Sequence, residues 1–458
     1  MDKEKQKRLI MGETMWKVVF KLSWPAIVAM VFYGMNTVFD AIFVGRYVGE
    51  TALAGVSLAY PLTQITLGFG SLIGVGAGSA LSIAIGENDR VTEQRLLGNA
   101  NYLSVIMTIL FMVAGLSFAE PWIRMMGGEG MALVYGVSYF KVTVYGTFFW
   151  IVGLAGNMLV RAEGKMKSAA VMMALGLIVN IVSNYLLIVI LDMGVEGAAI
   201  GTNIGMFVYT LAALVYFGRH MATFDAQPFS IVRDADIIKK ILSMGIPSLI
   251  MTVMTLLQAV VVLNALSTYG TTSDIAFYGI VYRLFTFMLT PIFGLMRALQ
   301  PVVGINFGAR QYERVISSVK VFAICATLLL LPFWVVMMVS PSIPLMMMLP
   351  GHGFSSFEVA NFRWFMGLLP ILPIIFMGMT FFPAVDQGKY ASIMGIVRQL
   401  VFYVPVMLIM PRYFGIHWVY LGSFVIDLLM IIWTATLMKK SFNTLRKSGD
   451  YAMEGVIQ

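Results

Sequence analysis

An acid inside a membrane-length apolar segment is the residue of this sequence best placed to do chemistry. The segment 21–44 (KLSWPAIVAMVFYGMNTVFDAIFV) carries Asp40, and about 20 apolar residues suffice to cross a bilayer core of about 30 Å. An aspartate there costs about 2.5–3.5 kcal/mol on insertion scales, and such acids usually mark an ion or substrate pathway. The alternative, an acid wetted by headgroups at the helix end, is disfavoured because the apolar run continues as AIFVG. We therefore predict that Asp40 couples transport to an ion.

Further polar residues in the first half of the chain could join this acid. Asn36 lies one helical turn before Asp40, and Asn180 and Asn184 are four residues apart, so they share one helix face. These amides could simply form hydrogen bonds between helices, typically worth about 0.6 kcal/mol each. Alternatively, they could pool oxygens with Thr202 around a sodium ion, because hard cations favour oxygen ligands. Both interpretations stay open for the predicted ion-coupling and candidate sodium set, which is Asp40, Asn180, Asn184 and Thr202.

Other polar or adaptable side chains inside apolar segments are candidates for contact with a substrate. The chain contains 36 methionines, and these side chains repack around ligands of varied shape, although lipid or core contacts explain most of them. Arg283 and Arg297 are fourteen residues apart and face one way, but Arg297 can snorkel towards the cytoplasm. Asp427 is a second buried acid, either an ion partner or a packing residue. The predicted substrate-binding residues are Asn36, Asn157, Asn203, Met35, Gln258, Tyr282 and Arg283.

The composition points to a protein whose solvent is the bilayer. Hydrophobic residues make up 59% of the 458 residues, charged residues only 12%, and the mean hydropathy is +0.85. Soluble domains carry about 25% charge, so this chain cannot cover a water-facing surface of its size. The net charge of +8 would suggest nucleic acid in a soluble protein, but the basic residues lie in short loops here. One cysteine, Cys325, excludes a disulfide framework.

Hydropathy predicts an all-α membrane protein with twelve transmembrane helices in two six-helix lobes. The longest polar stretch, 219–236, separates the sixth and seventh helices. The expected divisions are an N-terminal lobe at 1–218, a cytoplasmic linker at 219–239, a C-terminal lobe at 240–438 and a cytoplasmic tail at 439–458. The predicted helices are 17–44, 52–84, 96–119, 133–158, 168–191, 195–218, 240–268, 275–305, 316–340, 357–384, 390–411 and 416–438.

The two halves of the chain repeat one another. Prolines and glycines recur at a nearly constant offset of about 221–224 residues, as in Pro25 with Pro247 and Gly86 with Gly308. Six helices per half is an even number, so both halves share one orientation and are related by a pseudo-two-fold axis along the membrane normal. Such proteins bind substrate between the halves and expose it to each side in turn.

The distribution of lysine and arginine predicts the orientation. Roughly twenty basic residues fall in one set of loops, which includes both termini and Arg161, and about three fall in the other. We expect both termini in the cytoplasm of a bacterium and the helices in its cytoplasmic (inner) membrane.

Several stretches resemble the MATE (multidrug and toxic compound extrusion) family, in its DinF-like or MepA-like branch. They are LSWPAIVAM, NTVFDAIFVGRYVGETALAGVSLAYP, RAEGKMKSA, VNIVSNYLLI and GVEGAAIGTNIG, and the resemblance covers nearly the whole chain. It implies an antiporter that exports amphipathic, often cationic drugs in exchange for H⁺ or Na⁺, with Asp40 as the coupling acid. On the same pattern Pro25 is a hinge, Arg283 faces the opposite lobe, and Asn184 replaces an aspartate that related members often carry.

The expected function is thus a secondary active multidrug antiporter that works by alternating access. The alternative is a flippase for a lipid-linked oligosaccharide or another amphiphile of the same superfamily. An enzyme is not expected, since no paired carboxylates or Ser/His arrangement occurs. We expect no cofactor beyond the coupling ion, a small amphipathic substrate, contact with membrane lipid, no nucleic acid and a monomer.

Overall fold

The computed structural model describes residues 3–348 and 353–454, and all regular structure in these ranges is helical. The last residues of the predicted tail, 455–458, lie outside the described residues. The first half contains α1 (Lys3–Gly12), α2 (Met15–Phe43), the π-helical η1 (Val44–Val48), α3 (Glu50–Glu87), α4 (Arg90–Met125), α5 (Gly130–Tyr145), α6 (Thr147–Ala162), α7 (Met166–Asn184), the π-helical η2 (Tyr185–Ile190) and α8 (Gly194–Gly218). The second half contains α9 (Ala235–Tyr269), α10 (Thr272–Gly308), α11 (Tyr312–Val339), α12 (Ser342–Met348), α13 (Ser356–Met366), α14 (Pro373–Ala384), α15 (Gly388–Ile396), the π-helical η3 (Val397–Tyr403), α16 (Val404–Phe414) and α17 (His417–Glu454).

Each of the twelve predicted segments contains helix, and ten of them are single helices long and apolar enough to cross a membrane. The fourth segment is a pair, α5 and α6, bent by 55° at Gly146. The tenth is divided into α13 and the short apolar α14, which starts with Pro373 at its first turn. Proline lacks an amide hydrogen and suits a helix start, so the break follows from the sequence. The all-α membrane class with two lobes is confirmed.

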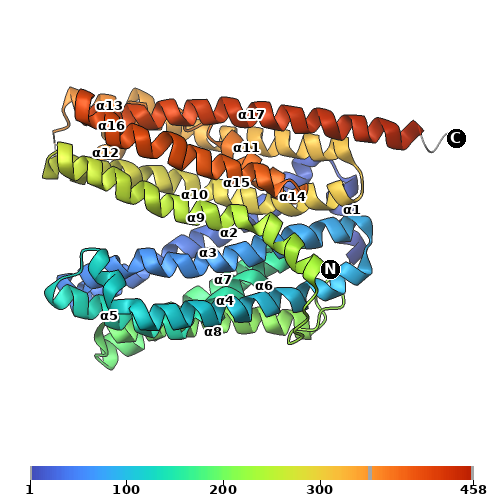
Figure 1. Cartoon of the computed structure of the whole chain (residues 1–458), viewed down its shortest axis with the longest axis horizontal. Helices are drawn as coiled ribbons and strands as arrows, with labels where there is room; N and C mark the ends of the chain where they lie inside the picture. Colours follow the sequence, from blue (N-terminus) through green and yellow to red (C-terminus); the bar gives the residue numbers. More distant parts are fainter. Residues whose placement is uncertain (1–2, 349–352, 455–458) are drawn as a thin grey trace.

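Two groups of helices lie beside one another along the length of the molecule. In Figure 1 the later helices (yellow to red) lie above the blue-to-green helices α3–α8, and both termini lie at the right-hand end. The contacts between the groups are made mainly by α3 with α9 and by α10 with α2 and α3. The two lobes therefore meet along four long helices.

Glycines at this junction reveal the internal symmetry. A methyl group added to Gly86 of α3 would overlap the carbonyl oxygen of Ile305 in α10. The repeat-related Gly308 stands in the same relation to the carbonyl oxygen of Ile83. A reciprocal contact of this kind, in which equivalent residues exchange partners, is the signature of a two-fold axis. The glycine pair predicted from the repeat thus lies on the pseudo-axis between the lobes.

The lobes are closed against each other at the end that carries the termini. Gly76 packs against the Ile241 backbone and Gly245 against the Leu72 backbone, so α3 and α9 touch there without intervening side chains. Gln300 of α10 also donates from Nε2 to the Ser79 hydroxyl, at 3.1 Å. Small residues permit such close helix approach in membranes, and the lobes therefore pack tightly together at this end.

The segment between the lobes has no helix from His220 to Asp234, as the polar composition predicts. It is held on α4 by backbone and side-chain bonds. The Asp234 amide donates to the Asn99 side chain at 2.8 Å, and the Val232 amide donates to the Gly98 carbonyl at 3.1 Å. The linker therefore follows the surface of the N-terminal lobe before α9 begins.

Candidate functional site

Asp40 lies near the end of α2 and is buried, with 8% of its surface exposed. Three side chains donate hydrogen bonds to its carboxylate. The Asn180 and Asn184 Nδ2 atoms lie 3.2 and 2.6 Å from Oδ1, and the Thr202 hydroxyl lies 3.1 Å from Oδ2. The structure thus brings together all four residues of the predicted ion-coupling set, which we call the acid cluster.

The helices that build the acid cluster approach closely because α8 carries glycine where α7 carries asparagine. A side chain on Gly201 would overlap the Asn184 amide oxygen, and one on Gly205 would lie 2.8 Å from the Asn180 Cβ. The asparagines, one turn apart on α7, therefore project over a flat face of α8 towards Asp40. This local geometry explains why the apolar run of α8 is interrupted by small residues.

The acid cluster contains no fixed positive charge. No lysine or arginine among the described residues forms an ion pair with Asp40, and only neutral donors hold its carboxylate. The Oδ1 atoms of Asn180 and Asn184 are buried and have no hydrogen-bond partner. Exchanging the oxygen and nitrogen of either amide by a 180° rotation would turn an oxygen towards the carboxylate. The four residues therefore fit either a proton on Asp40 or a cation held by oxygens.

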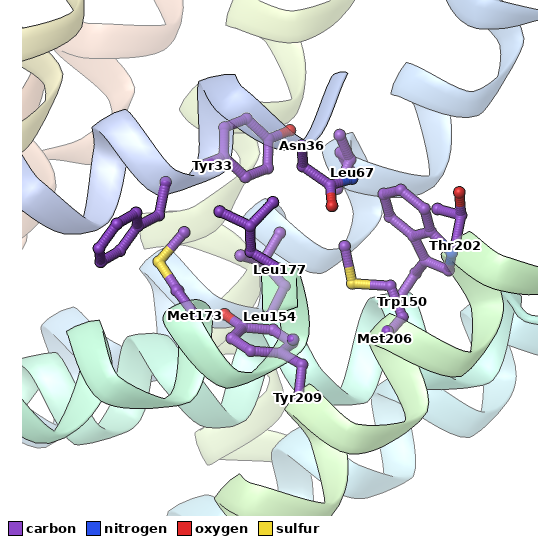
Figure 2. Close-up of a pocket in the computed structure, with 13 residues that line it drawn as sticks. Tyr33, Asn36, Leu67, Trp150, Leu154, Met173, Leu177, Thr202, Met206 and Tyr209 are labelled. Atoms are coloured by element: carbon purple, nitrogen blue, oxygen red, sulfur yellow. The ribbon is translucent and has the colours of Figure 1, made fainter. Parts of the chain in front are cut away.

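A cavity adjoins the acid cluster, and the empty space between its walls, including its open mouth, amounts to about 510 Å³. Its wall combines aromatic, methionine and small residues from α2, α3, α6, α7 and α8, including Tyr33, Trp150 and Met206. Figure 2 shows these side chains around the cavity, with Thr202 at one end and Met173 at the other. Because Thr202 both lines the cavity and binds Asp40, an occupant of the cavity would lie next to the acid.

The other predicted residues of the first half are dispersed around this cavity. Asn36 lines it, whereas Met35 is exposed and Asn157 is fully buried. Asn157 donates to the Ala169 carbonyl at 3.0 Å, and Asn203 donates to the Val142 carbonyl at 2.7 Å. The two amides therefore join helices within the lobe and are not part of the acid cluster.

The predicted residues of the second half lie in a different cluster. Gln258 accepts hydrogen bonds from Arg398 at 3.2 Å and from Gln399 at 2.6 Å. Arg398 also donates to Asp427 at 2.8 Å, in an ion pair whose side chains are 24% and 11% exposed. Tyr282 stacks on Tyr278, with ring centroids 5.8 Å apart. Asp427 thus has an arginine as its fixed partner within the second lobe.

The structure corrects or completes the interpretation of three arginines. Arg283 is exposed, so it is not at the cavity wall described above. Arg161, which we assigned to a cytoplasmic loop, is a residue of α6 that is only 5% exposed, because its side chain folds back along the helix to Asn157. Arg398 was missed altogether. It stands alone in an apolar run, and this is the same signal that identified Asp40.

Just beyond α6, Glu163 anchors the start of the inter-lobe linker. Its carboxylate accepts hydrogen bonds from the Tyr216 hydroxyl at 3.3 Å and from the Thr223 amide. Burial raises the pKa of Glu163 to about 7, against the lowering effect of the bonds from Thr223 and Tyr216. The acid therefore ties a loop to the end of α8 and changes charge near neutral pH.

Comparison with known proteins now places the chain. The family model MatE matches residues 25–186 and 247–409, one match in each lobe. Multidrug export protein MepA of Staphylococcus haemolyticus is 25% identical over 410 residues, covering 88% of both chains, and MepA of Staphylococcus saprophyticus is 24% identical, covering 90% of this chain and 91% of its own. A crystal structure of MATE in a bent conformation matches with a TM-score of 0.91 and 23% identity, covering 97% of this chain and 99% of its own. A MOP superfamily transporter from Pyrococcus furiosus matches with a TM-score of 0.88 and 24% identity, covering 96% of this chain and 99% of its own. The chain therefore belongs to the MATE family of multidrug export transporters, as the sequence motifs predicted.

Proposed function

We propose that this protein is a secondary active antiporter that exports amphipathic, often cationic compounds in exchange for H⁺ or Na⁺. The observation that carries the proposal is the acid cluster: a buried carboxylate held only by neutral donors, at the wall of an aromatic and methionine-rich cavity. An acid without a permanent cation needs a mobile one, because an isolated buried charge is costly in a membrane. A proton, a sodium ion or a cationic substrate can fill that need.

Exchange follows if the ion and the substrate compete for Asp40. With Asp40 ionised, the cavity attracts a lipophilic cation, whose apolar body contacts the methionines and aromatic rings. When an ion from outside neutralises the carboxylate, the cation loses its counter-charge and leaves. A ligand moves a conformational equilibrium only through its different affinity for the two states, and a single shared carboxylate supplies that difference.

The packing of the lobes supports alternating access. Backbone-to-backbone contacts at Gly76 and Gly245 close the end that carries the termini, which is the cytoplasmic end in the predicted orientation. The described chain would then be in the state closed to the cytoplasm, from which the acid cluster can take an ion from outside. In this scheme Pro25, inside α2, absorbs the bending of the helix that carries Asp40.

Ethidium export from vesicles with an imposed pH or sodium gradient tests the proposal. Asp40→Asn is expected to reduce gradient-driven export at least 100-fold, to the level of vesicles without the protein, because the amide cannot exchange an ion. Asp386→Asn makes the same change at an exposed position where asparagine tolerates the positive φ of 58°, and it should leave export unchanged. Export that survives Asp40→Asn would contradict the proposal.

A further inference from the structure

Two arginines from opposite lobes interact with residues of the cavity wall, without lining the cavity themselves. Arg161 belongs to α6 of the first lobe and Arg297 to α10 of the second. Arg161 is buried and Arg297 half-buried, and the two guanidinium groups repel one another. Two like charges at a lobe junction inside a membrane protein destabilise that junction unless something neutralises them.

The polar contacts of the two arginines, among the residues that the structure describes, are with neutral groups. Arg161 donates to the Asn157 amide oxygen at 2.8 Å and to the Met173 sulfur at 2.8 Å. Arg297 donates to the Met158 sulfur at 3.9 Å. Within the described part of the chain neither arginine forms an ion pair with a carboxylate. Thioether sulfur is a weak acceptor and each guanidinium has five N–H donors, so most of this donor capacity is unused.

Residues at the cavity wall connect this pair of arginines to the cavity. Met173, which accepts from Arg161, lines the cavity together with Tyr33 and Tyr209 (Figure 2). Tyr209 interacts electrostatically with both arginines, and its buried hydroxyl has no hydrogen-bond partner. Unsatisfied buried hydroxyls are rare and call for an explanation. An acceptor bound at the Met173 end of the cavity would satisfy the hydroxyl and the guanidinium groups together.

We propose that Arg161, Arg297 and Tyr209 form an anion-binding subsite for the carboxylate or phosphate group of an amphiphile whose apolar body fills the cavity. A planar guanidinium binds both groups through paired N–H donors. Because the acid cluster lies at the opposite end, the full site suits a zwitterion with its cationic group near Asp40. This inference rests on the proposed function for the assignment of the cavity to substrate, and it names the chemical class of that substrate.

Two dyes that differ only at a carboxylate test the subsite. Rhodamine 110 carries a free carboxylate, and rhodamine 123 is its methyl ester; fluorescence anisotropy measures the binding of each to the purified protein. Arg297→Gln and Arg161→Gln are each expected to raise the dissociation constant of rhodamine 110 about tenfold and to change that of rhodamine 123 less than twofold. Only rhodamine 110 has the carboxylate that forms a charge-assisted bond with an arginine. Arg161→Lys should recover part of the loss, since it restores the charge but not the fork.

Controls separate recognition from folding. Arg412→Gln removes the same charge at an exposed position and should leave both dyes unchanged. The wild-type protein gives a second readout that needs no variant: benzoate should displace rhodamine 110, and benzamide should not. Equal losses for the two dyes, no loss in either arginine variant, or equal competition by benzoate and benzamide would overturn the proposal.

The source of the anion is resolved in the same assay. Phosphatidylglycerol is added to the protein in phosphatidylcholine nanodiscs. If this lipid competes with rhodamine 110 for the wild-type protein but not for Arg297→Gln, the subsite binds a lipid headgroup. No competition assigns it to a soluble amphiphile. Since the assay measures binding without a gradient, its result is independent of whether Asp40→Asn abolishes export, and the two proposals can fail separately.

Discussion

The two lobes share one helical arrangement, but their buried acids have different hydrogen-bond partners. At the repeat offset of 221–223 residues, the positions of Asp40, Asn180, Asn184 and Thr202 correspond to Val262, Tyr403, Met407 and Ser423. The bond from the Asn180 amide to the Thr202 hydroxyl has a counterpart in the second lobe, where the Tyr403 and Ser423 hydroxyls are 2.6 Å apart. The carboxylate, however, is replaced by a buried valine.

The acid of the second lobe is instead on α17 and has a permanent partner. Asp427 accepts two bonds from Arg398, from Nε at 3.1 Å and from Nη2 at 2.8 Å, and Tyr403 lies against the guanidinium at 5.4 Å. An acid with a fixed cation has little need of a mobile one, whereas an acid held by neutral donors does. The partner, more than the burial, therefore separates a carboxylate that can take a mobile cation from one that is already paired.

Removing one member of the C-terminal pair should have the largest effect on stability. Asp427→Leu leaves Arg398 without a counter-charge and is expected to lower the free energy of unfolding by about 3 kcal/mol, seen as a fall of several degrees in Tm. The double variant Arg398→Met/Asp427→Leu should recover most of this loss and keep ion-driven ethidium export. A double variant that folds but no longer couples export to the gradient would break the distinction between the two lobes.

Adding a second acid to the N-terminal cluster should increase its affinity for a cation. The Asn184 Nδ2 atom lies 2.6 Å from the Asp40 carboxylate. Asn184→Asp therefore places a second carboxylate directly beside the first, which favours a bound cation. We expect about tenfold tighter sodium binding than in the wild type, measured as the sodium concentration that half-maximally raises Tm. Potassium at equal ionic strength is the control, and an equal response to both salts would contradict the prediction.

A smaller effect is expected at Glu163, outside both clusters. Its pKa is raised from 4.5 to about 7 by burial, so between these pH values the folded protein keeps a proton that the unfolded chain releases. Stability should therefore fall as pH rises through this window and level off above it. Glu163→Gln should remove this part of the pH dependence, a few degrees in Tm between pH 5 and 7.5, and identical profiles for wild type and variant would contradict it.

Much of this architecture could be predicted from the sequence because its physical signals are local. Apolar length defines the helices, and the glycine repeat identifies the residues that touch at the pseudo-axis. The acid cluster was also predictable. An acid on one helix and two asparagines one turn apart on another are costly in a membrane unless they form hydrogen bonds with each other.

The remainder could not be predicted because it depends on the path of long side chains. Arg161 occurs in a basic motif that resembles a loop, yet it folds back into the lobe to reach Asn157 and Met173. Arg283 and Arg297 lie on one helix, but only Arg297 interacts with residues of the cavity region, because neighbouring helices decide which parts of a face are covered. The pairing of Asp427 with Arg398 likewise joins two helices whose register the sequence does not specify.

Ion-dependent binding of ethidium to the purified protein tests the central claim most directly. The dissociation constant, measured while pH is lowered or sodium is raised, should increase for the wild type, because ion and dye compete for Asp40. In Asp40→Asn the binding should be weaker and independent of both ions, while Asp386→Asn should behave as the wild type. An equal ion dependence in wild type and Asp40→Asn would show that this carboxylate is not the shared site.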